Sequence, residues 1–370
     1  MNLAAQFAEY RKKQQEIEDA LEMLRKEKDI ILFPSGTVAR GFYNALLNYD
    51  IKVSFFGDNA LEKIGNEMNG VEILSFEEIL SKHKNALILV GTRVYEDEIR
   101  KHFLNSGFAS DRVLFYDFSY YRKMQISNFY ENLSSDEEQF DQVYNLLADD
   151  LSKKTFLQKI KYMHSFDSGD IEVIRCKNAM YFDSDFYRPQ KGEVVVDGGG
   201  FTGDTFLEYR EINPDYGKYY IFEPDPENFK VLSENLNGYE AIEAINKGLG
   251  EKDDKLVFYI RAGATTSDKG DLVCDEKMVL PVTSIDKVVN GGRVDFIKLD
   301  VEGSEREALL GSVETIRKYS PNLAVCVYHK PMDIVELPLL LHELCPEGEL
   351  YIRHYGKTGN DTVCYVLNGR

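Results

Sequence analysis

The stretch VVVDGGGFTGDTFLEY, residues 194–209, decides the fold of the C-terminal half of this chain. Its first residues, VVVD, predict a short buried strand, and the glycines that follow predict a tight turn. From Asp204 onward the pattern is that of a helix start. A strand, a glycine-rich turn and a helix in this order predict one unit of a parallel α/β sheet, in which ligands bind at the turn.

Two cofactor signatures overlap in this turn. Gly198, Gly200 and Gly203 form G-x-G-x-x-G, the dinucleotide-binding fingerprint. Asp197, Gly199 and Gly203 form D-x-G-x-x-x-G, the first motif of methyltransferases that use S-adenosylmethionine (SAM). Glycines in either register allow the backbone to approach a cofactor closely, so the glycines alone do not decide between the two cofactors.

The acid that ends the strand favours SAM. In a dinucleotide site the loop amides and the helix N-terminus hold a pyrophosphate, and a neighbouring carboxylate would be repelled by it. SAM has no phosphate and carries an ammonium group and a sulfonium, so carboxylates at Asp197 and Asp204 suit it better. We therefore expect Asp197 to face the cationic methionine end of SAM.

Two further strand ends carry acids. Glu223 ends the strand predicted for KYYIFE, at the spacing where an acid binds ribose hydroxyls in both NAD and SAM sites. Asp300 and Glu302 follow the strand in VDFIKLDVEG and project toward one face, because side chains alternate along a strand. Either carboxylate could orient or deprotonate a substrate hydroxyl. Alternatively, both could cap the next helix and pair with Lys298 or Arg306.

A set of ordered segments resembles the FkbM family of SAM-dependent methyltransferases across residues 180–370: VVVDGGGFTGDT, IFEPDPENF, NKGLG, VDFIKLDVEGSEREALLGSVETI, SPNLAVCVYHKPMDIVELPLLL and YIRHY. The resemblance implies a class I SAM-methyltransferase fold and methyl transfer, usually to a hydroxyl oxygen of a sugar or natural-product scaffold. The resemblance also implies residue roles in cofactor binding: Asp197, Gly199 and Gly203 at the amino-acid end of SAM, Glu223 at its ribose, and Asn246 of NKGLG as a further cofactor-binding residue. It places Asp300 and Glu302 at the active-site strand end, where Asp300 also borders the cofactor. Gly200 departs from the family, where alanine is common.

Methyl transfer to a hydroxyl needs a group that removes the hydroxyl proton. The candidates at strand ends are Asp300, Glu302, His329 of VYHKP and His354 of IRHYG, and histidine has the ordinary pKa nearest neutrality. We expect His329 to be the base, with Asp300 or Glu302 orienting it or the substrate. The same four side chains could instead bind a divalent metal that holds two neighbouring hydroxyls. We do not favour that alternative and assign no metal ligand.

The remaining pattern predicts the architecture. Residues 191–370 contain candidate strands at EVVVD, KYYIFE, YEAIEAI, KLVFYI, VDFIKLD, NLAVCVY, ELYIRHY and DTVCYVL. The last two are joined by GKTGN, which is too short for a helix, so they must pair as an antiparallel hairpin. We predict an α/β class: a mostly parallel, Rossmann-like sheet closed by a C-terminal antiparallel hairpin. The apolar segment NAMYFD, residues 178–183, is expected to cover one end of this sheet.

The N-terminal half predicts three further parts. Residues 29–118 alternate strands and helices on a smaller scale, which predicts a small Rossmann-like α/β domain. Residues 119–190 predict a helical connector, and residues 1–28 predict one N-terminal helix. The glycine fingerprint of the small domain is incomplete, and its Asp58 could bind a ribose or form a turn. We favour a structural role for Asp58.

The N-terminal helix carries apolar residues at alternating spacings of four and three, with one polar interruption: Leu3, Phe7, Tyr10, Gln14, Ile17, Leu21 and Leu24. This seam could join copies of the chain into a homo-oligomer. It is also the pattern of an amphipathic helix that packs on its own domain, which we favour slightly because the seam is short.

Composition excludes several classes of partner. The chain has 44 lysines and arginines against 63 acidic residues, and a net charge of −19 would repel nucleic acid and anionic membranes. The five cysteines are widely spaced and form no C-x-x-C, so a reducing, cytoplasmic setting is expected. The N-terminus becomes charged too early for a signal peptide.

The leading prediction is a SAM-dependent O-methyltransferase that acts on a small-molecule or glycan substrate. An alternative is an NAD-dependent sugar oxidoreductase, although no Tyr-x-x-x-Lys pair follows the glycine loop in a helix. A second alternative is a non-catalytic scaffold that binds a nucleotide without turnover.

Overall fold

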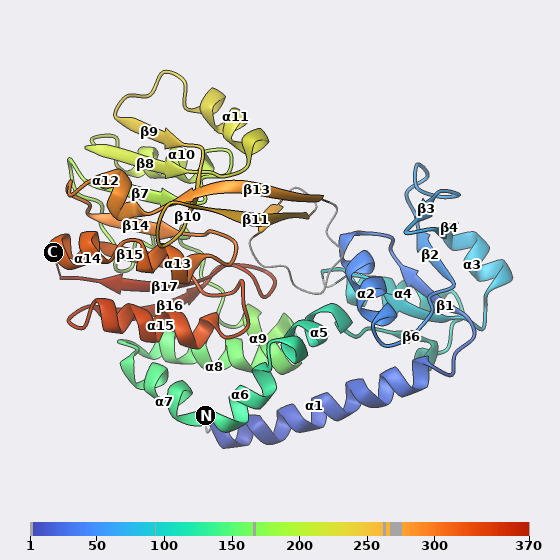
Figure 1. The fold of residues 1–370 in the computed structure, drawn as a ribbon. Helices are drawn as coiled ribbons and strands as arrows, with labels where there is room; N and C mark the ends of the chain where they lie inside the picture. Colours follow the sequence, from blue (N-terminus) through green and yellow to red (C-terminus); the bar gives the residue numbers. More distant parts are fainter. Residues whose placement is uncertain (1–2, 93, 166–167, 262–263, 267–275, 370) are drawn as a thin grey trace. The chain divides into compact units, whose positions relative to one another are not determined.

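The computed structural model describes residues 3–92, 94–165, 168–261, 264–266 and 276–369 (Figure 1). The chain divides into two compact units. The first comprises Met1–Glu131 and Ile160–Asp170, with Gly270–Val273, which lie outside the described residues. The second comprises Asn132–Lys159, Ile171–Lys269 and Cys274–Arg370. Among the described helices, none has the length and hydropathy needed to cross a membrane.

The first unit contains a six-stranded sheet in the order β3-β4-β2-β1-β5-β6. Its strands are β1 Ile30–Phe33, β2 Phe55–Asp58, β3 Glu67–Met68, β4 Val71–Ser75, β5 Leu87–Val90 and β6 Val113–Leu114. All adjacent pairs are parallel except β3 with β4. The helices between the strands are α2 Thr37–Leu47, α3 Phe76–Lys82, α4 Glu96–Asn105 and the short 3-10 helix η1 Ser110–Arg112. The predicted small Rossmann-like α/β domain is therefore present.

The carboxylate of Asp58 is used inside this first unit. It accepts hydrogen bonds from the Ser35 amide (3.1 Å) and hydroxyl (2.6 Å) and from the Lys63 ammonium (3.0 Å). These contacts tie the end of β2 to the turn after β1. These contacts are those of a structural residue that stabilises the turn, which is the role favoured for Asp58 from the sequence.

The N-terminal helix α1 spans Leu3–Leu24. Three residues of its apolar seam, Ile17, Leu21 and Leu24, are buried within the first unit. Glu18 accepts a hydrogen bond from the Tyr121 hydroxyl of α5, which spans Phe118–Ile126. Along its C-terminal half the helix thus packs on its own unit. Assembly of copies through this helix stays a prediction.

The second unit is built on a seven-stranded sheet in the order β16-β17-β15-β14-β7-β8-β9. Its strands are β7 Val194–Gly198, β8 Lys218–Phe222, β9 Ile242–Ile245, β14 Phe296–Leu299, β15 Asn322–Cys326, β16 Glu349–His354 and β17 Thr362–Leu367. Strand β17 is antiparallel to both of its neighbours, and the other pairs are parallel. The predicted C-terminal antiparallel hairpin is confirmed. Strand order reverses between β7 and β14, which is where ligands bind in sheets of this type.

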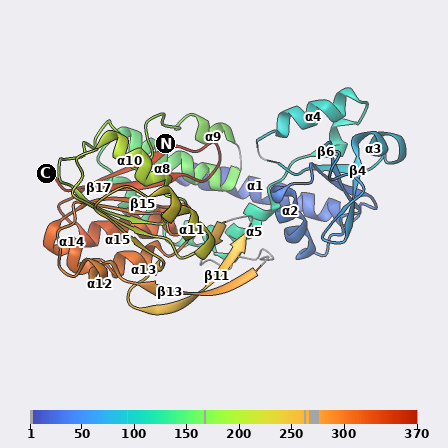
Figure 2. The ribbon, with the colours of Figure 1, turned by 90° about the horizontal axis from the view of Figure 1, so that it is seen from above.

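Helices cover both faces of this sheet, with α10 on one face and α14 on the other (Figure 2). The helices that follow β7 are α10 Asp204–Ile212, α11 Pro226–Asn235, α12 Ile285–Val289, α13 Glu305–Leu310, α14 Val313–Tyr319 and α15 Asp333–Leu344. The stretch predicted as a helical connector is helical, with α5, α6 Phe129–Ser135, α7 Glu137–Leu146, α8 Asp150–Ser165 and α9 Ser168–Glu172, but its residues are divided between the two units.

The strand predicted at KLVFYI lies outside the main sheet. It is β11, Asp254–Arg261, and it belongs to a separate four-stranded sheet with β10 Gly248–Leu249, β12 Ala264–Thr266 and β13 Glu276–Thr283. Strand β13 was not predicted from the sequence. Phe258, Leu280 and Val282 form the small core of this sheet. Because Phe258 comes from β11, the small sheet can contribute a side chain to a site at the edge of the main sheet.

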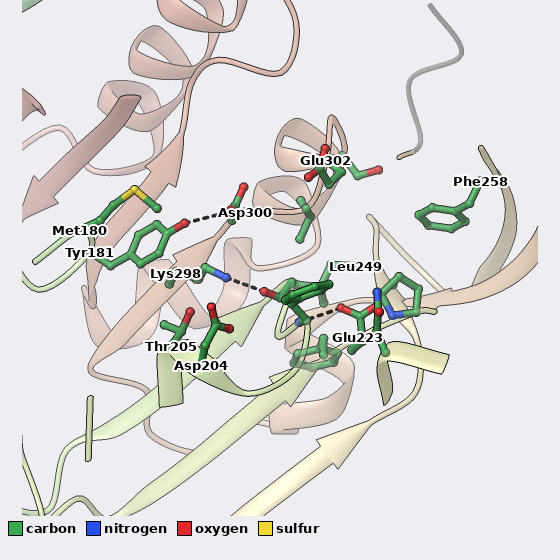
Figure 3. Close-up of a pocket in the computed structure, with 18 residues that line it drawn as sticks. Met180, Tyr181, Asp204, Thr205, Glu223, Leu249, Phe258, Lys298, Asp300 and Glu302 are labelled. Atoms are coloured by element: carbon green, nitrogen blue, oxygen red, sulfur yellow. Dashed lines mark hydrogen bonds between the residues drawn. The ribbon is translucent and has the colours of Figure 1, made fainter. Parts of the chain in front are cut away.

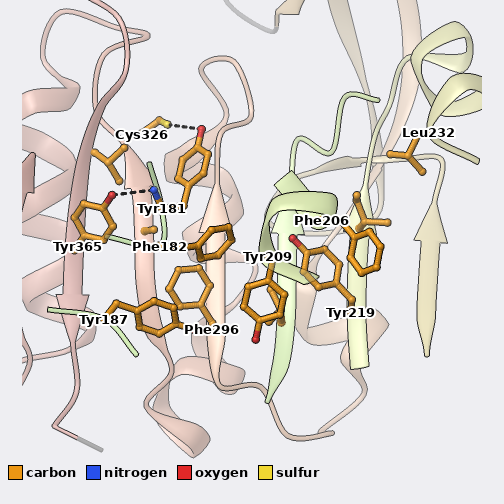
Figure 4. Close-up of a cluster of buried hydrophobic side chains, with 14 of the residues drawn as sticks. Tyr181, Phe182, Tyr187, Phe206, Tyr209, Tyr219, Leu232, Phe296, Cys326 and Tyr365 are labelled. Atoms are coloured by element: carbon orange, nitrogen blue, oxygen red, sulfur yellow. Dashed lines mark hydrogen bonds between the residues drawn. The ribbon is translucent and has the colours of Figure 1, made fainter. Parts of the chain in front are cut away.

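The core beneath the main sheet is rich in aromatic side chains, as Figure 4 shows. Phe182 packs against Tyr209 and Phe296, with ring centroids 5.1 and 5.7 Å apart. The tyrosine hydroxyls at the edge of this core have polar partners: those of Tyr187 and Tyr209 both donate to the buried carboxylate of Glu193. This packing joins the segment before β7 to strands β7 and β14, and so fixes the elements that carry the acids predicted above.

Candidate active site

A cavity of about 460 Å³ opens at the carboxyl ends of β7, β8 and β14 (Figure 3). It is lined by Met180 and Tyr181 before β7; Gly199, Phe201, Asp204 and Thr205 of the glycine loop and α10; Phe222, Glu223, Pro224 and Asn228 after β8; Gly248, Leu249 and Phe258 of the small sheet; and Lys298, Asp300, Val301, Glu302 and Ser304 after β14. The cavity therefore brings together the predicted residues Gly199, Asp204, Glu223, Asp300 and Glu302.

The glycine loop is packed tightly between the ends of β8 and β14. Gly199 has φ +82°, and a Cβ at this position would overlap the carbonyl oxygen of Asp300. Gly203, with φ +90°, occupies the N-cap position of α10. Both values lie in the left-handed region that glycine adopts without strain. The two glycines shared with the SAM signature are thus required by the backbone.

Three amides of this loop are engaged with the end of β8. The amides of Gly199 and Gly200 donate to the carbonyl oxygen of Phe222 at 3.0 and 2.8 Å, and the Phe201 amide donates to Glu223 Oε2 at 2.9 Å. A pyrophosphate site needs such amides to point at the phosphates. In this loop they are turned toward β8, so the arrangement does not match the dinucleotide interpretation of the motif.

Asp197 does not line the cavity, which corrects the expectation that it faces the cofactor. Its side chain is fully buried below the loop, where Oδ1 forms an ion pair with Lys298 Nζ at 2.9 Å and Oδ2 accepts from the Tyr219 hydroxyl at 3.0 Å. Lys298 Nζ also donates to the Gly199 carbonyl at 2.6 Å. Burial alone would lower the pKa of Lys298, but the carboxylates of Asp197 and Asp300 raise it, so the ammonium stays charged. Asp197 therefore holds the loop from below.

Asp204 is the carboxylate of the loop that does reach the cavity. It is exposed and is the first residue of α10. A carboxylate in this position can bind an ammonium group, while the helix N-terminus beside it favours a carboxylate group of a ligand. The amino-acid end of SAM carries both groups.

Glu223 borders the middle of the cavity, between Asp204 and the small sheet. Its Oε2 accepts from the Phe201 amide and its Oε1 from the Asp225 amide, both at 2.9 Å. Burial raises its pKa to about 7, although these amides partly offset the shift. Asn246 is nearby but does not line the cavity: its side chain donates to the carbonyls of Glu223 and Pro224 and braces the loop after β8.

The raised pKa of Glu223 predicts a pH-dependent affinity for adenosine ligands. Only the carboxylate can accept hydrogen bonds from both ribose hydroxyls, so the affinity for S-adenosylhomocysteine (SAH) should fall as the pH drops below 7. For a group with pKa near 7, the ionised fraction changes about tenfold between pH 8 and pH 6. Calorimetric titration across this range should show a loss of about that size. In Glu223→Gln the affinity should be lower and almost independent of pH, and an unchanged pH profile would assign the effect to another group.

Asp300 is held by several donors at the end of β14. Its Oδ2 accepts from the Tyr181 hydroxyl at 2.7 Å, and its Oδ1 accepts from the Tyr328 hydroxyl at 3.1 Å and lies 3.3 Å from His329 Nε2. Burial alone would raise the pKa of Asp300, but Lys298, His329 and the Tyr181 hydroxyl together lower it. Asp300 is thus a fixed anion rather than a proton acceptor.

His329 does not fit the base role expected from the sequence. Its Nδ1 lies 2.8 Å from Glu305 Oε1, and its Nε2 faces Asp300 Oδ1 at 3.3 Å and Glu302 Oε2 at 3.6 Å. Burial alone would lower the pKa of His329, but the three carboxylates raise it to about 10. The imidazole is therefore protonated at neutral pH and cannot accept a proton. Its partner Glu302, with 43% of its side-chain surface exposed, is the carboxylate that remains open to the cavity.

His354 does not join this group. It is fully buried at the end of β16, where Nδ1 lies 2.9 Å from Thr362 Oγ1, and burial lowers its pKa to about 3. Strand β16 is separated from β14 by β17 and β15, so the predicted catalytic role of His354 is not supported by its position. The cluster suited to a metal among the described residues is Asp300, Glu305 and His329.

Sequence reasoning missed several cavity residues. Tyr181 and Met180 belong to the apolar segment NAMYFD, which was expected only to cover the sheet. Phe258 belongs to the small sheet, and Lys298 was considered only as an ion-pair partner of Asp300 or Glu302. Met180 and Tyr181 precede β7 in the sequence but lie at its carboxyl end in the fold. No sequence pattern around these residues indicates that placement.

Comparisons with known proteins agree with this geometry. Residues 197–357 match the family model for the methyltransferase FkbM domain, and residues 26–114 match the model for the C2185-like N-terminal domain. The crystal structure of Methyltransferase FkbM from Methylobacillus flagellatus KT is similar in fold, with a TM-score of 0.74 and 20% identity over 99% of this chain and 100% of that chain. No curated protein sequence matches the chain.

Weaker likenesses cover about half of the chain. Fibrillarin from Aeropyrum pernix, solved with natively bound SAM, has a TM-score of 0.32 and 13% identity over 48% of this chain and 67% of its own. An rRNA methylase from Streptococcus thermophilus has the same score and identity over 49% of this chain and 90% of its own. The family match therefore identifies the chain as a methyltransferase, with residues 197–357 forming a methyltransferase FkbM domain within the second unit.

Proposed function

We propose that this chain is a SAM-dependent O-methyltransferase that transfers a methyl group to a hydroxyl of a sugar, a glycan precursor or a related natural-product scaffold. The observation that carries the choice of cofactor is the orientation of the loop amides: those of Gly199, Gly200 and Phe201 donate to β8 and its following residue. These three amides therefore do not point into the cavity, whereas the carboxylates of Asp204 and Glu223 line it. These acceptors suit a ligand that donates from an ammonium group and from ribose hydroxyls, and they disfavour a pyrophosphate.

The residues present fit SAM along the length of the cavity. Asp204 would bind the ammonium group, Glu223 would accept hydrogen bonds from the ribose hydroxyls, and the apolar wall at Leu249 and Phe258 would enclose the adenine. When bound, SAM supplies a methyl group on a sulfonium, which is displaced in line by the acceptor oxygen. The remaining cavity, at Met180 and Asp300, is then the acceptor end.

The acceptor end is built to orient a hydroxyl. Asp300 is held in one position by Tyr181, Tyr328 and protonated His329, so it can accept a hydrogen bond from the acceptor without moving. Glu302 is more exposed and is the carboxylate placed to take the hydroxyl proton. Alignment of the reacting groups supplies much of the rate enhancement in such transfers. A hydroxylated acceptor without phosphate groups suits this negatively charged end.

Ligand-dependent stability tests the choice of cofactor. A ligand that binds only the folded state stabilises it by about 2.7 kcal/mol at a hundredfold excess over its Kd. We expect SAH and SAM to raise the Tm of the full chain, and NAD⁺ and NADH to leave it unchanged. Stabilisation by NAD(H) alone would contradict the methyltransferase proposal. Release of SAH from SAM in the presence of hydroxylated acceptors would then separate an enzyme from a scaffold that only binds.

The proposed setting is the cytoplasm. The four cysteines that the structure describes, Cys176, Cys326, Cys345 and Cys364, are all free thiols, and three of them are buried. Such thiols are typical of a reducing compartment.

A further inference from the structure

A buried histidine surrounded by carboxylates lies beside the acceptor end of the cavity. His329 lies just after β15, Asp300 and Glu302 follow β14, and Glu305 is the first residue of α13. One oxygen or nitrogen from each of Asp300, Glu305 and His329 falls within 4.8 Å of the others. Side chains of these types, brought this close together, are those that bind divalent metal ions in proteins.

The imidazole is oriented by the carboxylate behind it. Glu305 is buried, and its Oε1 accepts from the Val301 amide at 3.0 Å while lying 2.8 Å from His329 Nδ1. This contact turns His329 Nε2 toward the cavity-lining carboxylates. Histidines that bind metals almost always have their second nitrogen bonded to a carboxylate or carbonyl in this way.

The distances around Nε2 are close to those within a metal coordination shell. Neighbouring ligands in an octahedral shell with bonds of about 2.1 Å lie about 3 Å apart. His329 Nε2 lies 3.3 Å from Asp300 Oδ1 and 3.6 Å from Glu302 Oε2. The hydroxyls of Tyr181 and Tyr328 hold Asp300 in place, as outer contacts hold ligating carboxylates in metal sites.

We propose that His329 Nε2, Asp300 and Glu302 bind one divalent cation of the Mn²⁺ or Mg²⁺ class beside the acceptor end, with Glu305 orienting the histidine. The cation would take the place of the Nε2 proton of His329, which is released to solvent on binding. One imidazole with two carboxylates suits these octahedral ions. If the proposed function holds, the cation would bind two neighbouring hydroxyls of the acceptor and lower the pKa of the one that is methylated. The acceptor class is then a vicinal diol, as in many sugars. Metal binding itself does not depend on that function.

The test is a titration of the full chain with Mn²⁺ after treatment with a chelator, following free Mn²⁺ by electron paramagnetic resonance. We expect saturable binding of one ion to the wild-type chain. Asp300→Asn, Glu302→Gln and His329→Gln should each weaken it by at least about tenfold. Glu314→Gln, which changes an exposed acid in the first turn of α14, is the matched control and should bind as the wild type does.

Two outcomes would contradict the proposal. No saturable binding by the wild-type chain would overturn it, and so would equal binding by Glu302→Gln and the wild type. Glu302 is the most exposed of the ligands, so its variant keeps the test valid if His329→Gln fails to fold. Thermal stabilisation by SAH, measured on the same samples, separates the metal proposal from the proposed function. SAH binding without Mn²⁺ binding would contradict only the metal site. Mn²⁺ binding without SAH binding would contradict only the choice of SAM as cofactor.

Discussion

Gly199→Ala should reduce the affinity for SAH by at least about a hundredfold. A left-handed backbone costs a residue with a Cβ about 1–2 kcal/mol, and at this position the Cβ would also overlap the carbonyl oxygen of Asp300. The loop cannot relieve the overlap without leaving Phe222, to which the amides of Gly199 and Gly200 are bonded. A shift of the loop would displace both the Asp204 and the Glu223 contacts of the ligand. Calorimetric titration with SAH measures the loss.

Gly203→Ala is the matched control for this variant. Its φ of +90° carries the same backbone cost, but a Cβ there would be 3.4 Å from its nearest neighbour, Leu236 Cδ2, which is ordinary contact. We expect this variant to lose about 1–2 kcal/mol, or roughly five- to thirtyfold in affinity if all of it falls on the bound loop. Equal losses in the two variants would show that backbone strain alone, and not the approach to Asp300, sets the effect.

Lys298→Met should destabilise the second unit by about 3–5 kcal/mol. Lys298 and Asp197 are 2% and 0% exposed, and removing one partner of a buried pair leaves the other charge without compensation. The substitution also removes the ammonium that bonds to the Gly199 carbonyl. Urea denaturation followed by the fluorescence of the tyrosines gives the change in unfolding free energy.

The double variant Asp197→Asn with Lys298→Met isolates the buried charge. Because neither member of this pair is then charged, most of the lost stability should return, while the Tyr219 hydroxyl can still donate to the side-chain oxygen of the new amide. If Asp197→Asn does not rescue Lys298→Met, the cost comes from lost packing or from the Gly199 contact. If the unfolding free energy of the single variant Lys298→Met is within about 1 kcal/mol of the wild-type value, Asp197 and Lys298 do not form a stabilising buried ion pair.

Local patterns were enough to predict the strands of the main sheet and the edge at which the cavity lies. Strand β7 ends in glycines, and the acids Glu223 and Asp300 follow the next parallel strands, so the carboxyl ends of parallel strands had to meet at one edge. The hairpin β16–β17 followed from the length of one loop. The position of a residue at a strand end and the length of a loop between two strands can both be read from a short segment of sequence.

Side-chain partners could not be predicted in the same way. Asp197 and Lys298 are adjacent in the sheet only because β14 pairs with β7, and nothing near Asp197 in the sequence indicates that a lysine neutralises it. His329 has an ordinary spacing after β15, and its protonation depends on three carboxylates from another loop. The sequence therefore indicated which edge carries the strand-end acids, whereas the partners that make Asp197 and His329 unsuited to their expected roles are visible only in the fold.

The segment before β7 sets a limit on how this chain can be shortened. Its Tyr181 amide donates to the Tyr365 hydroxyl, and further upstream the amides of Cys176 and Ala148 donate to the carbonyls of His354 and Leu350 along β16. Strand β16 is the last strand of its sheet, and edge strands without cover pair readily with other chains. A fragment that begins at residue 191 would lose one wall of the cavity and expose this edge at once. Truncation or domain exchange should therefore keep residue 147 and everything after it as one piece.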